Sequence, residues 1–296
     1  MAYSFINDGD VFVTIAKLPG RDASTFWRIR MSGCGLTRTL CLTLAWCALS
    51  PAQAARNELN GTFFTSTRVI YPESALQGKS VVLNNNDDRN FLLQAFITPP
   101  DGQTGLPGAP TQDFLVTPPL SRLGAHQTRT LRVLRTGGHF PADRESVFFL
   151  TARLIPSEAP PDKKRPPQPR GAVVKYLTAL SIKVFWRPQR LNKLNAVEDA
   201  AGKLKAAIQG DVLTLTNPTP YYVTLRTLSI GGADVPTTQL MRMVPPLSNQ
   251  TWTLPAGTKR ASVIPVIWTA IKESGFDTAP FLSPVAVSSA ATFSTR

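Results

Sequence analysis

The side chains that most often carry catalysis or metal binding are scarce in this 296-residue sequence. Its three cysteines all lie near the N-terminus, and its two histidines, His126 and His139, lack the spacing of metal ligands. No Gly-x-Ser-x-Gly segment and no glycine-rich phosphate loop occurs, so neither an activated serine nor a nucleotide site is indicated. The carboxylates are scattered, which leaves a paired acid and base open. We predict a binding protein that is not an enzyme, has no metal site and needs no cofactor or nucleotide.

The N-terminal segment has the pattern of an export signal. Basic residues up to Arg38 precede a mostly apolar run, Leu40–Leu49, which is followed by the small-residue site Ala52-Gln53-Ala54. We therefore predict a signal peptide over residues 31–54, preceded by an upstream extension or long basic region over residues 1–30. The apolar run is too short to cross a bilayer, so no membrane insertion is expected.

Removal of this signal would leave a basic chain without cysteines. Cys34, Cys41 and Cys47 all fall inside it, so the exported protein would be held together by its core and not by disulfides. The net charge of +13 would become +11, because residues 1–54 hold five Lys or Arg and three Asp or Glu. Such a charge admits a polyanion as partner, but the basic residues are spread along the chain and export argues against nucleic acid.

The remaining sequence is typical of an all-β protein. Short alternating segments are separated by turns rich in Gly, Pro, Asn and Asp, and no long amphipathic helix occurs. We predict two β-sandwich domains in tandem, over residues 55–188 and 189–296. The strands expected in the first are 63–71, 80–84, 91–97, 113–117, 127–134, 146–154 and 173–186. Those expected in the second are 212–216, 222–230, 251–254, 261–271 and 284–293.

One segment of the second domain is ambiguous between helix and irregular structure. Residues 200–209 have some helical character, but Gly202 interrupts the segment and Gly210 ends it. We therefore expect an irregular approach to the next strand.

The stretch Val173–Pro188 is partly apolar on both faces of an expected strand. Such a strand is either buried between layers or lies at an edge where another strand can pair with it. It follows a loop in which six prolines flank the charged run Asp162–Arg165. This loop either provides solubility alone or leaves the adjoining strand free to pair with another chain.

Several spaced motifs resemble those of the periplasmic chaperones of the chaperone–usher pilus pathway. They occur in the family's order and span essentially residues 60–290. The matching segments are Thr67–Tyr71, Thr117–Leu123, Phe140–Ser157, Ile182–Pro188 and Asn217–Val223.

This resemblance implies both a shape and a function. The fold would be two immunoglobulin-like β-sandwich domains in tandem, forming an L shape with an interdomain cleft. The protein would act in the periplasm, binding, folding and capping pilus or fimbrial subunits by donor-strand complementation. It would then deliver them to an outer-membrane usher without using nucleotide.

The resemblance also assigns roles to particular residues. Arg68 and Lys183 match the cations that bind the C-terminal carboxylate of a subunit, a role for which charge-assisted hydrogen bonds are suited. Val174, Tyr176 and Thr178 match the donor residues, which are spaced by two so that they point to one side. Thr178 departs from the aliphatic residue expected there, so Leu180 could contribute more.

A third implied group is an ion-pair network at the domain junction, formed by Glu145, Arg187 and Glu273. Two other positions depart from the family pattern: Thr151 stands where Asn or Cys is usual, and Ala152 where a large aliphatic residue is usual.

The leading hypothesis is thus a chaperone of fibre subunits, and two alternatives belong to other classes. One is a structural or adhesive two-domain β-sandwich protein that is itself exposed on the cell surface. If this protein were a subunit of a surface fibre, it would be expected to carry its own N-terminal donor extension and to lack one strand. Neither feature is evident in the sequence. The other is an exported hydrolase, for which no nucleophile has a base in view.

Overall fold

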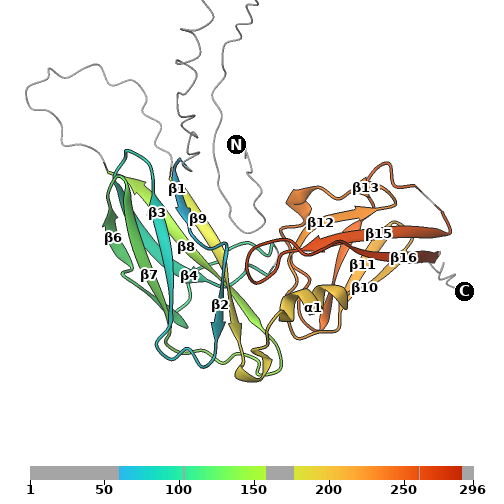
Figure 1. Ribbon diagram of the computed structural model, residues 1–296, viewed down its shortest axis with the longest axis horizontal. Helices are drawn as coiled ribbons and strands as arrows, with labels where there is room; N and C mark the ends of the chain where they lie inside the picture. Colours follow the sequence, from blue (N-terminus) through green and yellow to red (C-terminus); the bar gives the residue numbers. More distant parts are fainter. Residues whose placement is uncertain (1–59, 103, 158–176, 260, 289–296) are drawn as a thin grey trace, which may run out of the picture.

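A computed structural model describes residues 60–102, 104–157, 177–259 and 261–288. Nearly all of the regular structure is β-strand, and it forms two sandwiches that meet at an angle near the C-terminal end of strand β9 (Figure 1). The prediction of an all-β chain with two tandem immunoglobulin-like sandwiches is confirmed. The predicted signal peptide, residues 31–54, and the upstream residues 1–30 lie outside the described residues.

The first sandwich packs a four-stranded sheet, ordered β1-β3-β7-β5, against a five-stranded sheet, ordered β2-β9-β8-β4-β6. One continuous core lies between these sheets and includes Leu83, Leu131, Leu150 and Ile182, all fully buried. The strands are β1 (Thr62–Phe64), β2 (Arg68–Pro72), β3 (Lys79–Asn85), β4 (Phe91–Thr98), β5 (Phe114–Thr117), β6 (Leu120–Leu123), β7 (Gln127–Arg135), β8 (Ser146–Pro156) and β9 (Thr178–Arg187).

The first predicted strand, residues 63–71, is divided between the two sheets. β1 pairs with β3 in one sheet, whereas β2 runs parallel to β9 in the other. The chain crosses between the sheets at Thr65–Thr67, a change of partner that residue alternation does not reveal. The prediction of one continuous strand was therefore wrong, and the short strand β6 was missed.

The second sandwich is made from a single seven-stranded sheet, ordered β13-β12-β15-β16-β10-β11-β14. It curls so that both halves bury side chains in one core, and the two halves meet where β16 runs parallel to β10. The strands are β10 (Lys205–Gln209), β11 (Val212–Asn217), β12 (Leu225–Ile230), β13 (Ala233–Asp234), β14 (Ser248–Thr253), β15 (Val263–Ala270) and β16 (Phe281–Ser288). The described residues also include two 3-10 turns, η2 (Gln189–Leu191) and η3 (Thr237–Gln239).

The expectation of irregular structure over residues 200–209 was wrong. Helix α1 (Ala196–Gly202) ends at the glycine, and β10 begins at Lys205. Ala200 and Ala201 are buried, and Trp268 Nε1 on β15 donates a hydrogen bond to the Ala201 carbonyl at 3.1 Å. Small side chains and this tertiary hydrogen bond outweigh the low helix propensity of glycine.

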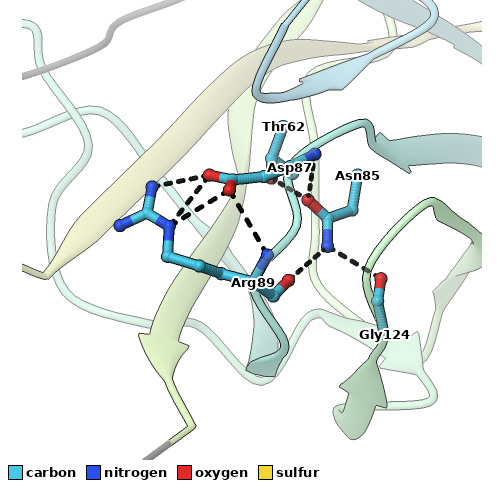
Figure 2. Close-up of polar contacts among 5 residues, drawn as sticks. All are labelled: Thr62, Asn85, Asp87, Arg89 and Gly124. Atoms are coloured by element: carbon cyan, nitrogen blue, oxygen red, sulfur yellow. Dashed lines mark hydrogen bonds and ion pairs between the residues drawn. The ribbon is translucent and has the colours of Figure 1, made fainter.

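A buried asparagine fixes the turn after β3 in the first sandwich. The Asn85 Oδ1 accepts hydrogen bonds from the Asp87 amide at 3.1 Å and the Thr62 hydroxyl at 3.0 Å (Figure 2). Its Nδ2 donates to the carbonyls of Arg89 at 2.8 Å and Gly124 at 2.7 Å. The side chain thus satisfies backbone groups of two separate turns, as buried polar groups require.

The second sandwich repeats this arrangement after the equivalent strand β11. Asn217 Oδ1 accepts from the amide and the hydroxyl of Thr219, and Asn217 Nδ2 donates to the carbonyls of Tyr221 and Val244. In both domains the asparagine bonds the amide two residues later and the carbonyl four residues later. The same side chain therefore closes the same turn twice.

Replacement of Asn85 by alanine should destabilise the first domain. It would leave buried backbone groups of Asp87, Arg89 and Gly124 without these partners, at a cost of about 1–3 kcal/mol. Chemical denaturation followed by circular dichroism measures the loss. The matched control is Asn84→Ala, because the hydrogen bond that Asn84 accepts from the Thr128 hydroxyl is exposed. Equal losses in the two variants would show that Asn85 has no special role.

Candidate functional site

The two cations predicted to bind a carboxylate lie on neighbouring strands at the domain junction. β2 and β9 run parallel with Arg68 directly opposite Lys183. Because residues two apart in a strand share a face, both side chains point away from the sandwich core, to which Val69 and Val184 belong. The strand register thus brings both cations onto one face.

Arg68 connects this face to the second domain. Its Nη1 donates a hydrogen bond to the Ile271 carbonyl at 3.0 Å, and its guanidinium lies 5.6 Å from the centre of the Phe185 ring. Arg68 is 6% exposed and Lys183 is 1% exposed, so both charges are withdrawn from bulk water. Charge-assisted interactions are strengthened in such surroundings.

A cavity of about 430 Å³ lies beside Arg68, between the two domains. Residues 65–68, at the crossing between β1 and β2, form one wall, and residues 273–276 of the second domain form the other. Gly275 has a φ of +88°, and a Cβ atom at this position would lie 2.7 Å from Thr67 Oγ1. Glycine therefore permits both this turn and its close approach to the first domain.

The structure describes only part of the predicted donor segment. Thr178 is the first residue of β9 and is partly buried, whereas Val174 and Tyr176 lie outside the described residues. Thr178 shares a face with Leu180 and Ile182, which enter the core. From Thr178 to Ile182 the strand pairs with β8, and the described residues supply no strand on its other edge.

The three residues predicted to form an ion-pair network do lie together. Arg187 Nε donates to Glu145 Oε1 at 2.7 Å, and Arg187 Nη2 lies 2.7 Å from Glu273 Oε1. The second contact is a close ion pair that lacks the angle of a hydrogen bond. The side chains of Arg187 and Glu145 are each 1% exposed, and that of Glu273 is 27% exposed. Glu145 belongs to the first domain and Glu273 to the second, so Arg187 joins them.

Burial and ion pairing have opposite effects on the pKa values in this network. It raises the pKa of Glu145, and the positive charge of Arg187 offsets only part of that effect. Burial also acts to lower the pKa of Arg187, but the charges of Glu145 and Glu273 outweigh it and the pKa is raised. The guanidinium therefore remains charged inside the protein.

Backbone and ring contacts complete the junction on the side of the second domain. Glu145 Oε2 accepts a hydrogen bond from the Tyr222 amide at 2.9 Å, and the Glu145 amide donates to the Pro220 carbonyl at 2.9 Å. The Tyr221 ring centre lies 5.2 Å from the guanidinium carbon of Arg187. These contacts come from the turn that Asn217 closes.

Sequence reasoning missed one feature of this junction and one further along the same sheet. Val147, Phe185 and Met243 form a small buried cluster, against which Ile70 and Tyr222 pack. On the same face of the sheet, the Thr151 and Ser181 hydroxyls are 2.8 Å apart and hydrogen-bonded within the buried interior. Both are contacts between segments that are distant in the sequence. Only the presence of apolar or polar residues on the same face of two neighbouring strands could have suggested them.

Two other kinds of site were sought in the described part of the chain. Its residues include no group of three or more His, Cys, Asp or Glu side chains that could hold a metal ion. None of the described helices has the length and apolarity needed to cross a membrane.

Comparison with known proteins identifies the family to which this two-domain fold and its cleft belong. Residues 61–192 match the family described as pili and flagellar-assembly chaperone, PapD N-terminal domain. Residues 199–280 match the family described as pili assembly chaperone PapD, C-terminal domain. The chain therefore belongs to the PapD family of pilus-assembly chaperones.

Individual relatives and solved structures agree with this assignment. The chain is 33% identical over 225 residues to the probable fimbrial chaperone protein ElfD of Escherichia coli K12, covering 76% of this chain and 88% of that protein. The solved structure of the E. coli chaperone DraB has a TM-score of 0.61 and 31% identity, covering 76% of this chain and 97% of that one. The SafB chaperone of Salmonella enterica, solved in complex with the SafA pilin, has a TM-score of 0.63 and 28% identity, covering 77% and 97%.

Removal of Glu145 should strongly destabilise the junction. Glu145→Ala leaves Arg187 buried with one fewer counter-charge and deprives the Tyr222 amide of its acceptor, at a cost of about 3–5 kcal/mol. Denaturation midpoints measure the loss. Asp143→Ala is the control, because Asp143 forms an exposed ion pair with the adjacent Arg144 and its removal should barely change the midpoint. A Glu145→Ala midpoint as close to wild type as the control would contradict a structural role for the network.

Loss of Arg187 should make stability depend on pH. In Arg187→Met, Glu145 stays buried without its cation, so its pKa in the folded state should rise further above the unfolded value. A group whose pKa is higher in the folded state than in the unfolded state stabilises the folded protein at pH values below its unfolded-state pKa. This stabilisation is lost as the pH rises through the folded-state pKa. The deficit of Arg187→Met relative to wild type should therefore be smaller at pH 5 than at pH 7.5. The pH dependence of this deficit should disappear in the double variant Arg187→Met, Glu145→Gln. If the pH dependence persists there, a group other than Glu145 causes it.

Proposed function

We propose that this protein is a periplasmic chaperone that binds fimbrial subunits in the cleft between its domains, caps them and delivers them to an outer-membrane usher. The family assignment and the relatives named as fimbrial chaperones support this role over a surface-exposed adhesive protein. Residence in the periplasm rests on the predicted signal peptide and on the family. The observation that carries the proposal is the position of Arg68 opposite Lys183 beside an edge of β9 that the described strands leave open.

Arg68 and Lys183 are proposed to bind the C-terminal carboxylate of the subunit. Two cations on adjacent strands place several donors on one side of the sheet, where a carboxylate can accept from both. Withdrawal of these groups from water strengthens the interaction, and the strand register fixes where the chain end must lie. The anchor therefore sets the register of the bound subunit.

The part of β9 before Lys183 is proposed to pair with an edge strand of the subunit. Backbone hydrogen bonds along such an edge supply affinity, and alternate side chains enter the groove of the partner. Val174, Tyr176 and Thr178 would supply those side chains. The hydroxyl of Thr178 would then require a small or polar subsite in the partner, because Leu180, the other residue expected to contribute, is buried in the core of the first sandwich.

The proposed activity requires binding alone, without catalysis or nucleotide. The ion-pair network of Glu145, Arg187 and Glu273 would hold the two domains in the relative position that forms the cleft. A buried network of this kind fixes geometry more than it adds stability. Because the domains are already in position, subunit binding would not have to supply the free energy needed to arrange them.

The carboxylate anchor can be tested by replacing Lys183 with methionine, which keeps the side-chain length and removes the charge. When the protein is co-expressed with a fimbrial subunit that it binds, Lys183→Met should reduce the co-purified complex at least about tenfold, because a charge-assisted hydrogen bond is lost. Co-purification from periplasmic extracts measures the complex.

Two comparisons separate the anchor from a general effect of charge or folding. Lys205→Met removes an exposed charge from β10 and should leave the complex unchanged. A subunit extended by two glycines at its C-terminus, which displaces the carboxylate, should bind wild type and Lys183→Met equally weakly. If the extension weakens binding to wild type and Lys183→Met by the same further factor, Lys183 does not bind the carboxylate.

A further inference from the structure

A second polar pocket, of about 350 Å³, lies at a corner of the first sandwich away from the cleft. It is placed between the turn that joins β3 to β4 and the turn that joins β6 to β7. β6 and β2 are at opposite edges of the five-stranded sheet, so this corner is remote from Arg68. The lining residues are Asn90, Arg122, Gly124, Ala125, Gln127 and Arg129.

Two side-chain amides of this pocket have a fixed orientation. Asn90 Oδ1 accepts a hydrogen bond from the Ala125 amide at 3.1 Å, and Gln127 Oε1 accepts from the Gly124 amide at 3.0 Å. Because a backbone N–H can only donate, it identifies the oxygen end of each side chain. The ends that remain, Nδ2 of Asn90 and Nε2 of Gln127, are both donors.

The two arginines add further donors. Arg129 Nη2 donates to the Arg122 carbonyl at 2.7 Å, which holds the Arg129 guanidinium against the turn. Its Nε is buried and has no hydrogen-bond partner among the described residues. Arg122 is exposed at the mouth of the pocket.

The two carboxylates near this corner do not line the pocket. Asp87 is paired with Arg89, and Asp88 lies 2.8 Å from His126. No carboxylate is among the residues that line the pocket. Donors therefore predominate among the side-chain groups that line the pocket, and two of these side chains carry positive charge.

We propose that this pocket binds an oxyanion, specifically the carboxylate of an acidic segment in a protein partner. A carboxylate offers acceptors alone and matches the fork of an arginine, so it complements a site in which donors predominate. The walls are held in place by Asn85, which donates to the Gly124 carbonyl (Figure 2), and by the Ser157 amide, which donates to the Asn90 carbonyl. The site is thus built before the ligand arrives, and it does not depend on the function proposed for the cleft.

The test is a titration of the isotope-labelled protein, followed by nuclear magnetic resonance. The probe is a Gly-Glu-Glu-Gly peptide with blocked termini, with Gly-Gln-Gln-Gly as the neutral control and inorganic phosphate as a separate titrant. We expect saturable shifts of the Gly124, Ala125 and Gln127 amide signals with the acidic peptide and none with the neutral one. Saturation by phosphate without saturation by the peptide would overturn the assignment to a protein carboxylate, and saturation by neither would overturn the site.

Variants make the proposal specific to the two arginines. Arg129→Gln should weaken peptide binding about tenfold or more through the loss of a charged donor, and Arg122→Gln, at an exposed position, provides the same test if Arg129→Gln fails to fold. The matched control is Arg132→Gln on the same strand, because Arg132 donates to the Gln77 carbonyl outside the pocket. Equal weakening in the control would show that only net charge matters and would overturn the pocket.

Discussion

The buried charge of Arg187 is the constraint on which the arrangement of the two domains depends. Its guanidinium is removed from water, so it must find counter-charges and hydrogen-bond acceptors inside the protein. Glu145, from the first domain, and Glu273, from the second, provide them. Displacement of either domain would leave a buried charge with one partner, so the electrostatics favour a single relative position. The interdomain cleft takes its shape from that position.

The repeated asparagine turns connect this constraint to the cores of the sandwiches. Asn217 closes the turn that presents the Pro220 carbonyl and the Tyr222 amide to Glu145. That turn is therefore fixed by a buried side chain before it contacts the first domain. Asn85 performs the same closure in the first sandwich, where it holds the corner that carries the second pocket. The same asparagine turn thus supports the domain junction in the second sandwich and the polar pocket in the first.

Much of the fold follows from alternation along the sequence, but the choice of partner strands does not. The period of two places Lys183 on the face opposite Val184, yet the crossing at Thr65–Thr67 depends on which strands are available to pair. Helix α1 was missed because it depends on Trp268, which is distant in sequence. The network residues also lie far apart in the chain, so the family resemblance identified them where spacing could not. The cluster around Phe185 and Met243 had no such guide.

The pair of cations also limits what the cleft can recognise. Arg68 and Lys183 are cations on directly opposed residues, so an anion that reaches both side chains can accept charge-assisted hydrogen bonds from both. A side-chain carboxylate in the middle of a chain could satisfy the charges, but its backbone would continue in both directions past the anchor. On the far side of Lys183, β9 is already paired with β2, so no open edge remains there for a continuing strand. A chain that ends at the proposed anchor would avoid this conflict and could still pair along the preceding residues of β9. The strand register and the two charges together therefore favour a C-terminal carboxylate over an internal one.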